Sequence, residues 1–240
     1  MILLLSGEGP SDIGTLNGQE FVPGVMTLLI DQLTEAQWGY SFLDGQSVEF
    51  VSKKDLIDMC KTKKKSAVLV GLKKGKGTAE FHKNAQALAI LSKNLANKEG
   101  CAVGCVLFRD CDGVRASART RWQEKWDSME EGFKAQGFGF GVPMIPKPKS
   151  ESWILCALQD SPHRDCDQLE DLPGNDSSSG APKEVLAQKL LELGLGDSST
   201  ANLMRLVREG KIDVRQINMP SYNAFKNRLN STLREMLRNA

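Results

Sequence analysis

The feature that most constrains this chain is an apolar run that ends in two carboxylates. Residues 102–108 are mostly apolar, as expected of a strand that is buried on both faces of a parallel sheet. Asp110, Asp112 and Gly113 follow directly, at the strand end where open α/β sheets place their ligands. Alternation along a strand predicts that both carboxylates point the same way. They could hold a hard cation such as Mg²⁺, or they could form a solvated turn.

The rest of the first 146 residues alternates between strand-like and helix-like segments. This order predicts an α/β fold, with a parallel sheet that carries helices on both faces. Residues 14–23 hold several glycines and Pro23 and are expected to be irregular. Strands are predicted at residues 1–6, 48–51, 102–108 and 139–145. Helices are predicted at 25–33 (extending toward Trp38), from Phe81 to Leu95 and at 116–135. The apolar run at 67–72 could be a strand or the end of a helix.

The pattern changes after residue 146. Residues 160–181 are rich in Asp, Pro, Gly and Ser and are expected to form a loop. The chain is therefore divided into an α/β domain, residues 1–146, and a helical C-terminal section, residues 147–240, that packs on it. Helices of this section are predicted at 151–158, 183–193, 200–209 and 225–237.

Composition narrows the setting but not the function. The 240 residues are 40% hydrophobic and 25% charged, with a net charge of +1, which is ordinary for a globular protein. No apolar run approaches the roughly 20 residues of a membrane helix, and the start lacks the pattern of a signal peptide. We therefore expect a cytoplasmic protein. Its six cysteines form no CxxC pair and it has only two histidines, so we expect reduced thiols and no zinc site.

Further acids follow other predicted strands. Glu8 comes just after the first strand, Asp12 lies four residues later, and Glu151 follows the strand at 139–145. Parallel strands bring such residues to one rim of the sheet. Clustered carboxylates repel one another, and burying them without a partner is costly. The sequence therefore favours a cation at this rim, although Asp12 would also suit the first turn of a helix.

These motifs resemble a known fold family. Glu8-Gly9 after the first strand, with Asp110-x-Asp112 after a later one, resembles the TOPRIM fold of topoisomerases, primases and nucleases. The segment Glu8-Gly9-Pro10-Ser11-Asp12 resembles the E-G-x-[ST]-[ED] form of OLD-type nucleases. Together with Arg109-Asp110-x-Asp112-Gly113, Lys147-Pro148-x-x-Glu151-Ser152-Trp153 and Met219-Pro220-Ser221-Tyr222, the set is similar to small stand-alone TOPRIM-like proteins, found mainly in bacteria and in part near defence systems.

The resemblance implies a metal-dependent nuclease that acts in bacterial defence or DNA processing. Glu8, Asp110 and Asp112 would be metal ligands or acid/base groups, and Asp12 and Glu151 would help to bind a second ion. One or two Mg²⁺ or Mn²⁺ ions are implied. OLD-type nucleases also carry a late catalytic lysine, for which the candidates are Lys149, nearer the acids in sequence, and Lys226.

Lysine-rich segments offer a surface for nucleic acid. Residues 53–98 hold 12 lysines against three acids. They are either a solvated face or contacts to phosphates without base specificity. The chain has no G-x-x-x-x-G-K-[ST] motif, so any ATPase would be a partner in trans, and a homodimer is a further option. The residues expected to touch nucleic acid are Lys73, Lys74, Lys76 and Arg115.

Two other functions remain open from the sequence. Asp110-x-Asp112 also resembles the first motif of haloacid-dehalogenase-type phosphatases, with Asp110 as nucleophile and Asp112 as acid/base. That family normally begins near this motif, whereas here about a hundred residues precede it, and Glu8 is left without a role. The other alternative is a non-catalytic subunit of a larger complex, in which the acids are structural.

Overall fold

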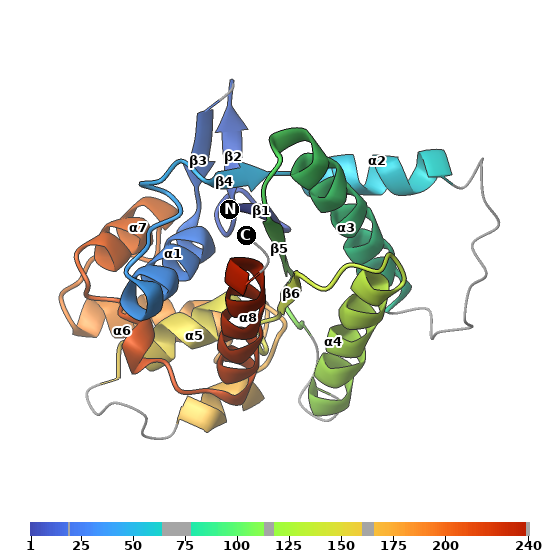
Figure 1. Ribbon diagram of the computed structural model, residues 1–240. Coiled ribbons are helices and arrows are strands. Elements are labelled where there is room, and N and C mark those ends of the chain that lie inside the picture. Colours follow the sequence, from blue (N-terminus) through green and yellow to red (C-terminus); the bar gives the residue numbers. More distant parts are fainter. Residues whose placement is uncertain (19, 64–77, 113–117, 160–165, 239–240) are drawn as a thin grey trace.

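A four-stranded parallel sheet forms the centre of the protein (Figure 1). The computed structural model describes residues 1–18, 20–63, 78–112, 118–159 and 166–238. The strand order is β4-β1-β5-β6, and all three pairings are parallel. The strands are β1 (Ile2–Ser6), β4 (Val48–Phe50), β5 (Val103–Phe108) and β6 (Gly141–Met144). The predicted α/β class and all four predicted strands are confirmed.

Helices cover both faces of the sheet, as the alternation of elements predicts (Figure 1). On one face, α2, α3 and α4 enclose a core that includes Leu4, Cys105 and Leu107. On the other face, α1 and the C-terminal helices enclose a core that includes Leu5, Val106 and Phe108. Successive residues of β5 thus point into opposite cores. The helices are α1 (Val25–Trp38), α2 (Lys53–Lys63), α3 (Ala79–Glu99), α4 (Ala118–Lys134), α5 (Ser150–Ala157), α6 (Pro182–Glu192), α7 (Thr200–Arg208) and α8 (Pro220–Arg238), with the 3₁₀ turns η2 (Cys166–Asp171) and η3 (Val214–Gln216).

The C-terminal section shares the core of the sheet domain. Helix α8 packs on β6 and β5, and its Phe225, Leu229 and Leu233 are buried beside Val142 and Met144 of β6. Burial of such side chains stabilises the fold by roughly 1.5–3 kcal/mol each. The described helices include none that is long and apolar enough to cross a bilayer.

Two expectations from the sequence are wrong. Residues 14–17 and 20–23 are not irregular: they form the antiparallel strands β2 (Gly14–Asn17) and β3 (Glu20–Pro23). Both strands are only four residues long, and they leave Leu16 and Val22 exposed. The cysteines are not all reduced. Cys156 and Cys166 form a disulfide, because the end of α5 and the start of η2 bring their Cα atoms within 5.4 Å.

Candidate carboxylate site

The carboxylate site lies where neighbouring parallel strands end. Strands β1 and β5 pair in register up to Ser6 and Leu107, so Glu8 and Asp110 follow adjacent strand ends. The pairing with the chain after β6 continues beyond β5. Arg109 N donates to Met144 O at 3.0 Å, and Cys111 N donates to Pro146 O at 3.0 Å. The segment that carries the acids is therefore held by backbone hydrogen bonds.

This extended segment sends neighbouring side chains to opposite sides of the rim. Arg109 points toward the α2–α3 side, where its Nε lies 3.4 Å from Glu8 Oε1. Asp110 points toward α5, where its Oδ1 accepts a hydrogen bond from Ser150 N at 3.0 Å. Asp112 has a left-handed φ of 40° and an exposed side chain. The rim is thus divided into an acidic side around Asp110 and a mixed side around Glu8.

The acidic side brings together four of the five predicted metal ligands. Burial raises the pKa of Asp110 well above its usual value, and the negative charges of Asp12, Glu151 and Asp112 raise it further. The hydrogen bond from Ser150 N acts in the opposite direction. Such a rise means that the ionised carboxylate lacks adequate compensation in its surroundings. The acids from the ends of β1, β5 and β6 therefore form one electrostatic cluster, as the strand order predicts.

Asp12 lies in a turn that is fixed by the start of α1. The first amides of that helix donate back to the turn, from Val25 N to Ser11 O at 3.0 Å and from Met26 N to Asp12 O at 2.8 Å. These bonds satisfy amides that have no partner inside the helix. A Cβ at Gly24 would lie only 2.4 Å from Asp12 O, so the glycine permits this contact.

The surroundings of Asp12 disfavour its ionised form. Burial raises its pKa to about 6, and the charges of Glu151 and Glu8 contribute to the rise. The Ser150 hydroxyl lies 3.3 Å from Asp12 Oδ1 and opposes it. Ser150 thus contacts both Asp110 and Asp12, a role that no sequence motif predicts.

Lys149 lies beside the acidic side of the rim. Its Nζ is 3.5 Å from Asp112 Oδ1 and 2.8 Å from Asp176 Oδ1. Burial acts to lower its pKa, but the hydrogen bond with Asp176 and the nearby carboxylates raise the pKa overall. Lys149 is therefore protonated at neutral pH. Asp176 lies in the segment expected to be a loop, and no motif distinguished it.

Glu8 does not share the surroundings of Asp110. Its Oε1 lies 3.1 Å from Lys53 Nζ and 3.4 Å from Arg109 Nε, and Lys53 also lies 3.6 Å from Glu80. The charge of Glu8 acts on Asp12, whereas the charges that raise the pKa of Asp110 are those of Asp12, Glu151 and Asp112. Glu8 is thus at the predicted rim but is paired with cations.

Two of the sequence motifs meet behind the site and support it. Trp153 Nε1 donates to Ser221 Oγ at 2.9 Å, and its ring packs against Tyr222. Ser221 N donates to Glu170 Oε1 at 2.7 Å, and the buried Lys147 lies 3.5 Å from Glu170 Oε2. The segment before α5 is thereby joined to η2 and α8, which holds the positions of the neighbouring site residues.

The predicted metal can be tested against these groups. Among the described residues, no three His, Cys, Asp or Glu side chains form a group that could hold an ion as they stand. The acidic side does supply the oxygen-only donors that Mg²⁺ prefers, and burial together with neighbouring carboxylates raises the pKa of Asp12 and Asp110, as expected of acids that lack a cation. The residues therefore fit such an ion in the chemistry of their donor atoms.

The structure does not test the predicted nucleic-acid contacts. Lys73, Lys74, Lys76 and Arg115 fall outside the described residues, as does the apolar run at 67–72. Among the described residues, Lys53, Arg109 and Lys149 lie beside the predicted acids, and Lys125 donates to Cys111 O in the same segment.

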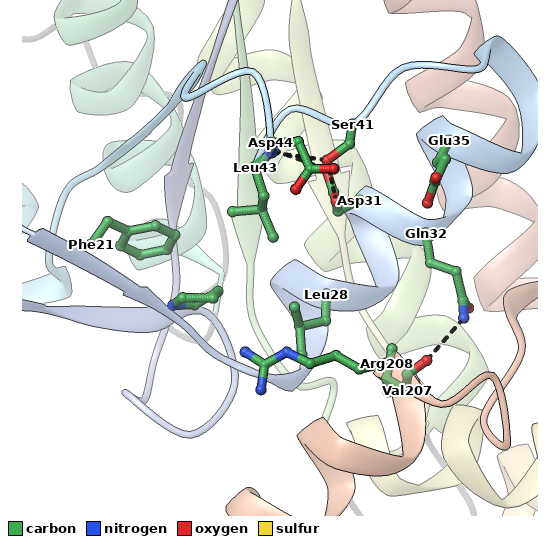
Figure 2. A pocket seen from close by; sticks show the side chains of 11 residues that line it. Phe21, Leu28, Asp31, Gln32, Glu35, Ser41, Leu43, Asp44, Val207 and Arg208 are labelled. Carbon is green, nitrogen blue, oxygen red and sulfur yellow. Dashed lines mark hydrogen bonds between the residues drawn. The ribbon is translucent and has the colours of Figure 1, made fainter.

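A separate pocket of about 550 Å³ lies between α1, β3, α7 and the segment after α1 (Figure 2). Two of its polar side chains, Asp31 and Gln32, hold neighbouring elements together. Asp31 accepts from Ser41 Oγ at 2.7 Å, and Gln32 Nε2 donates to Val207 O at 3.3 Å. No predicted site residue lines it. The lining residues are Phe21, Pro23, Leu28, Asp31, Gln32, Glu35, Ser41, Leu43, Asp44, Val207 and Arg208.

Comparisons with known proteins do not assign this chain to a family. Comparison of the chain with protein-family models, with curated proteins and with solved structures finds no match.

Proposed function

We propose that this protein is a Mg²⁺- or Mn²⁺-dependent nuclease, related in its arrangement to TOPRIM nucleases, that cleaves nucleic-acid phosphodiesters in the cytoplasm. One observation carries the proposal. Asp12 and Asp110 come from different strand ends and share Ser150 as a hydrogen-bond donor. Burial and neighbouring carboxylates raise the pKa of both, with Glu151 acting on each of them. Perturbed acids that converge at a strand-end rim are typical of functional sites.

The acidic side supplies the groups that would hold the cation, namely Asp12, Asp110, Asp112 and Glu151. The chemistry that Mg²⁺ supplies when bound is neutralisation of charge on the phosphate oxygens and activation of a water molecule. Ser150 orients Asp110 and Asp12 through its amide and hydroxyl. Lys149, as an ammonium group beside Asp112, would stabilise negative charge on a phosphate, and Lys226 on α8 is the alternative lysine.

The direct test is a cleavage assay. Purified protein is incubated with plasmid DNA, linear DNA and RNA in the presence of Mg²⁺, Mn²⁺ or a chelator, and Asp12→Asn and Asp110→Asn are compared with the wild type. Metal-dependent cleavage that both substitutions abolish is the expected result. Hydrolysis of a small phosphomonoester that needs Asp110 but not Asp12 would instead support the phosphatase alternative. An absence of both turnover and metal binding would favour the non-catalytic subunit.

The partners follow from this proposal. A nucleic-acid substrate would be bound through its phosphates without base specificity, and a partner ATPase or a second copy of the chain would act in trans. A disulfide such as Cys156–Cys166 is uncommon in the cytosol. Cleavage is therefore best measured with and without a reductant.

A further inference from the structure

The buried guanidinium of Arg109 has an incompletely used edge. Its side chain is 2% exposed. Nη1 donates to Phe108 O at 2.8 Å, and Nε lies 3.4 Å from Glu8 Oε1. Nη2 is buried and has no hydrogen-bond partner among the described residues. A buried donor without a partner costs free energy. Arg109 Nη2 is therefore available to bind an acceptor supplied by a ligand.

The unsatisfied nitrogen lies on the same edge as the one that faces Glu8. The Nε–H and one Nη2–H of a guanidinium point in parallel, so this edge pairs bidentately with carboxylates and phosphates. Glu8 presents one oxygen, Oε1, to both Arg109 Nε and Lys53 Nζ. One carboxylate oxygen therefore serves two cations and leaves half of the fork unused.

Glu8 is the partly exposed member of this arrangement. The side chains of Lys53 and Glu8 are 34% and 35% exposed, and an ion pair at that exposure contributes little to stability. Arg109 is 2% exposed, so another anion would have to replace the Glu8 carboxylate beside it. Lys53 has a second carboxylate, Glu80, at 3.6 Å. Movement of Glu8 into solvent would leave Lys53 and Arg109 facing the rim. A tetrahedral anion has enough oxygens to contact Lys53 Nζ and both nitrogens of the Arg109 edge.

We propose that Arg109 and Lys53 form a phosphate-binding site, in which a phosphate of the nucleic-acid backbone takes the place of the Glu8 carboxylate. The inference rests on the proposed function for the identity of the ligand, and it deepens that function by naming the residues that bind the phosphate. The phosphate would replace the Glu8 carboxylate as the anion beside Arg109 and Lys53, so both cations would keep a negatively charged partner. The acidic side around Asp110 remains on the opposite side of the rim.

The test measures binding without catalysis. A fluorescein-labelled single-stranded oligonucleotide is titrated with protein in a chelator, and fluorescence anisotropy gives the Kd at several salt concentrations. We expect Lys53→Met to raise the Kd about tenfold and to reduce the salt slope by about one, as for the loss of one phosphate contact. Arg109→Lys keeps the positive charge but loses the bidentate edge, so it should raise the Kd about tenfold with little change in the salt slope. Lys54→Met, an exposed neighbour on the same helix, is the matched control and should have little effect.

Glu8→Gln supplies a readout of opposite sign. Loss of the competing carboxylate should tighten oligonucleotide binding about three- to tenfold, whereas a purely structural ion pair gives no reason for tightening. Circular dichroism verifies the fold of each variant, and Lys53→Met and Glu8→Gln, both at partly exposed positions, keep the test informative if Arg109→Lys does not fold. Equal Kd values for Lys53→Met, Glu8→Gln and Lys54→Met would overturn the inference.

The outcomes separate this inference from the proposed function. Binding that responds to Lys53 and Glu8 in a protein without cleavage activity would support the phosphate site and refute the nuclease. Metal-dependent cleavage by a protein whose oligonucleotide binding is insensitive to both residues would support the nuclease and refute the phosphate site. Inorganic phosphate is titrated as a second probe. The same response to Glu8→Gln would show that the site recognises a phosphate group as such, and a response with the oligonucleotide alone would assign it to the backbone.

Discussion

The backbone amide of Ser150 donates a hydrogen bond to the carboxylate of Asp110, with 3.0 Å between Ser150 N and Asp110 Oδ1. This bond joins the first residue of α5 to the segment that follows β5. The Ser150 hydroxyl reaches Asp12 from the same position. A single residue therefore sets the orientation of two acids that are 98 residues apart in the sequence.

Replacement of Asp110 should separate its catalytic role from its structural one. Asp110→Asn keeps an oxygen for the Ser150 amide but removes a charge that its neighbours disfavour. We expect cleavage to fall at least about 100-fold and the metal-free protein to gain free energy of unfolding, because the folded state no longer carries a disfavoured carboxylate. Cleavage assays and urea unfolding at pH 7.5 measure these effects. Asp44→Asn, an exposed acid on the segment after α1, controls for net charge, and normal cleavage with reduced stability would contradict the prediction.

Asp12 should make stability depend on pH. Its pKa in the folded protein is raised from 3.8 to about 6, so the folded state holds a proton that the unfolded state has lost. The free energy of unfolding should therefore fall as the pH rises from about 4 to about 7, by no more than about 3 kcal/mol from this group. Urea unfolding in a chelator across this range compares wild type with Asp12→Asn. A constant difference between the two proteins would contradict the assigned shift.

Lys149 should matter more than Lys226 for cleavage. Lys149 lies against Asp112 at the acidic side of the rim, whereas Lys226 lies on α8. We expect Lys149→Met to lower kcat by about 10- to 100-fold and Lys226→Met to leave it nearly unchanged. Steady-state cleavage kinetics, with separate kcat and KM values, provide the measurement. A larger loss in Lys226→Met would reassign the catalytic lysine.

A methyl group at position 24 should disturb the turn that carries Asp12. In Gly24→Ala the new Cβ would meet Asp12 O and Ser11 O, which are backbone atoms that cannot move cheaply. We expect a loss of about 1–3 kcal/mol in stability and weaker Mg²⁺ binding by calorimetry. Gly139→Ala, where the added Cβ meets nothing within 4 Å, is the control. Equal behaviour of the two variants would show that the close contact is not a constraint.

Much of the fold could be predicted from the sequence because its signals are local. The buried strands read as apolar runs, and α4 and α8 show helical spacing. The convergence of Asp12, Asp110 and Glu151 followed from the rule that parallel strands end at one rim. The hairpin at 14–23 was missed because its strands are short and largely exposed, and the disulfide depends on a contact that no spacing rule specifies.

The part of the site that could not be predicted depends on side-chain direction across separate segments. The sequence placed Glu8 with Asp110, but Glu8 faces Lys53, which is 45 residues away. Arg109 was visible in the motif, yet its burial and its pairing with Glu8 emerge only from the packing of α2 and α3. Ser150 and Asp176 carried no signal, because Ser and Asp are common at helix starts and in loops.

Helix α1 connects the turn that carries Asp12 to the chain near η3 and α7, and it is rigid along its length. Its first amides hold the Asp12 turn, while Gln32, two turns along, holds the chain near η3 and α7 through Val207, Ile212 and Val214. Helices are stiff along their axes, so a rigid shift at one end is transmitted to the other. Filling the pocket beside Gln32 (Figure 2) in a way that tilts α1 would therefore change the position of Asp12, although nothing in the pocket touches that acid.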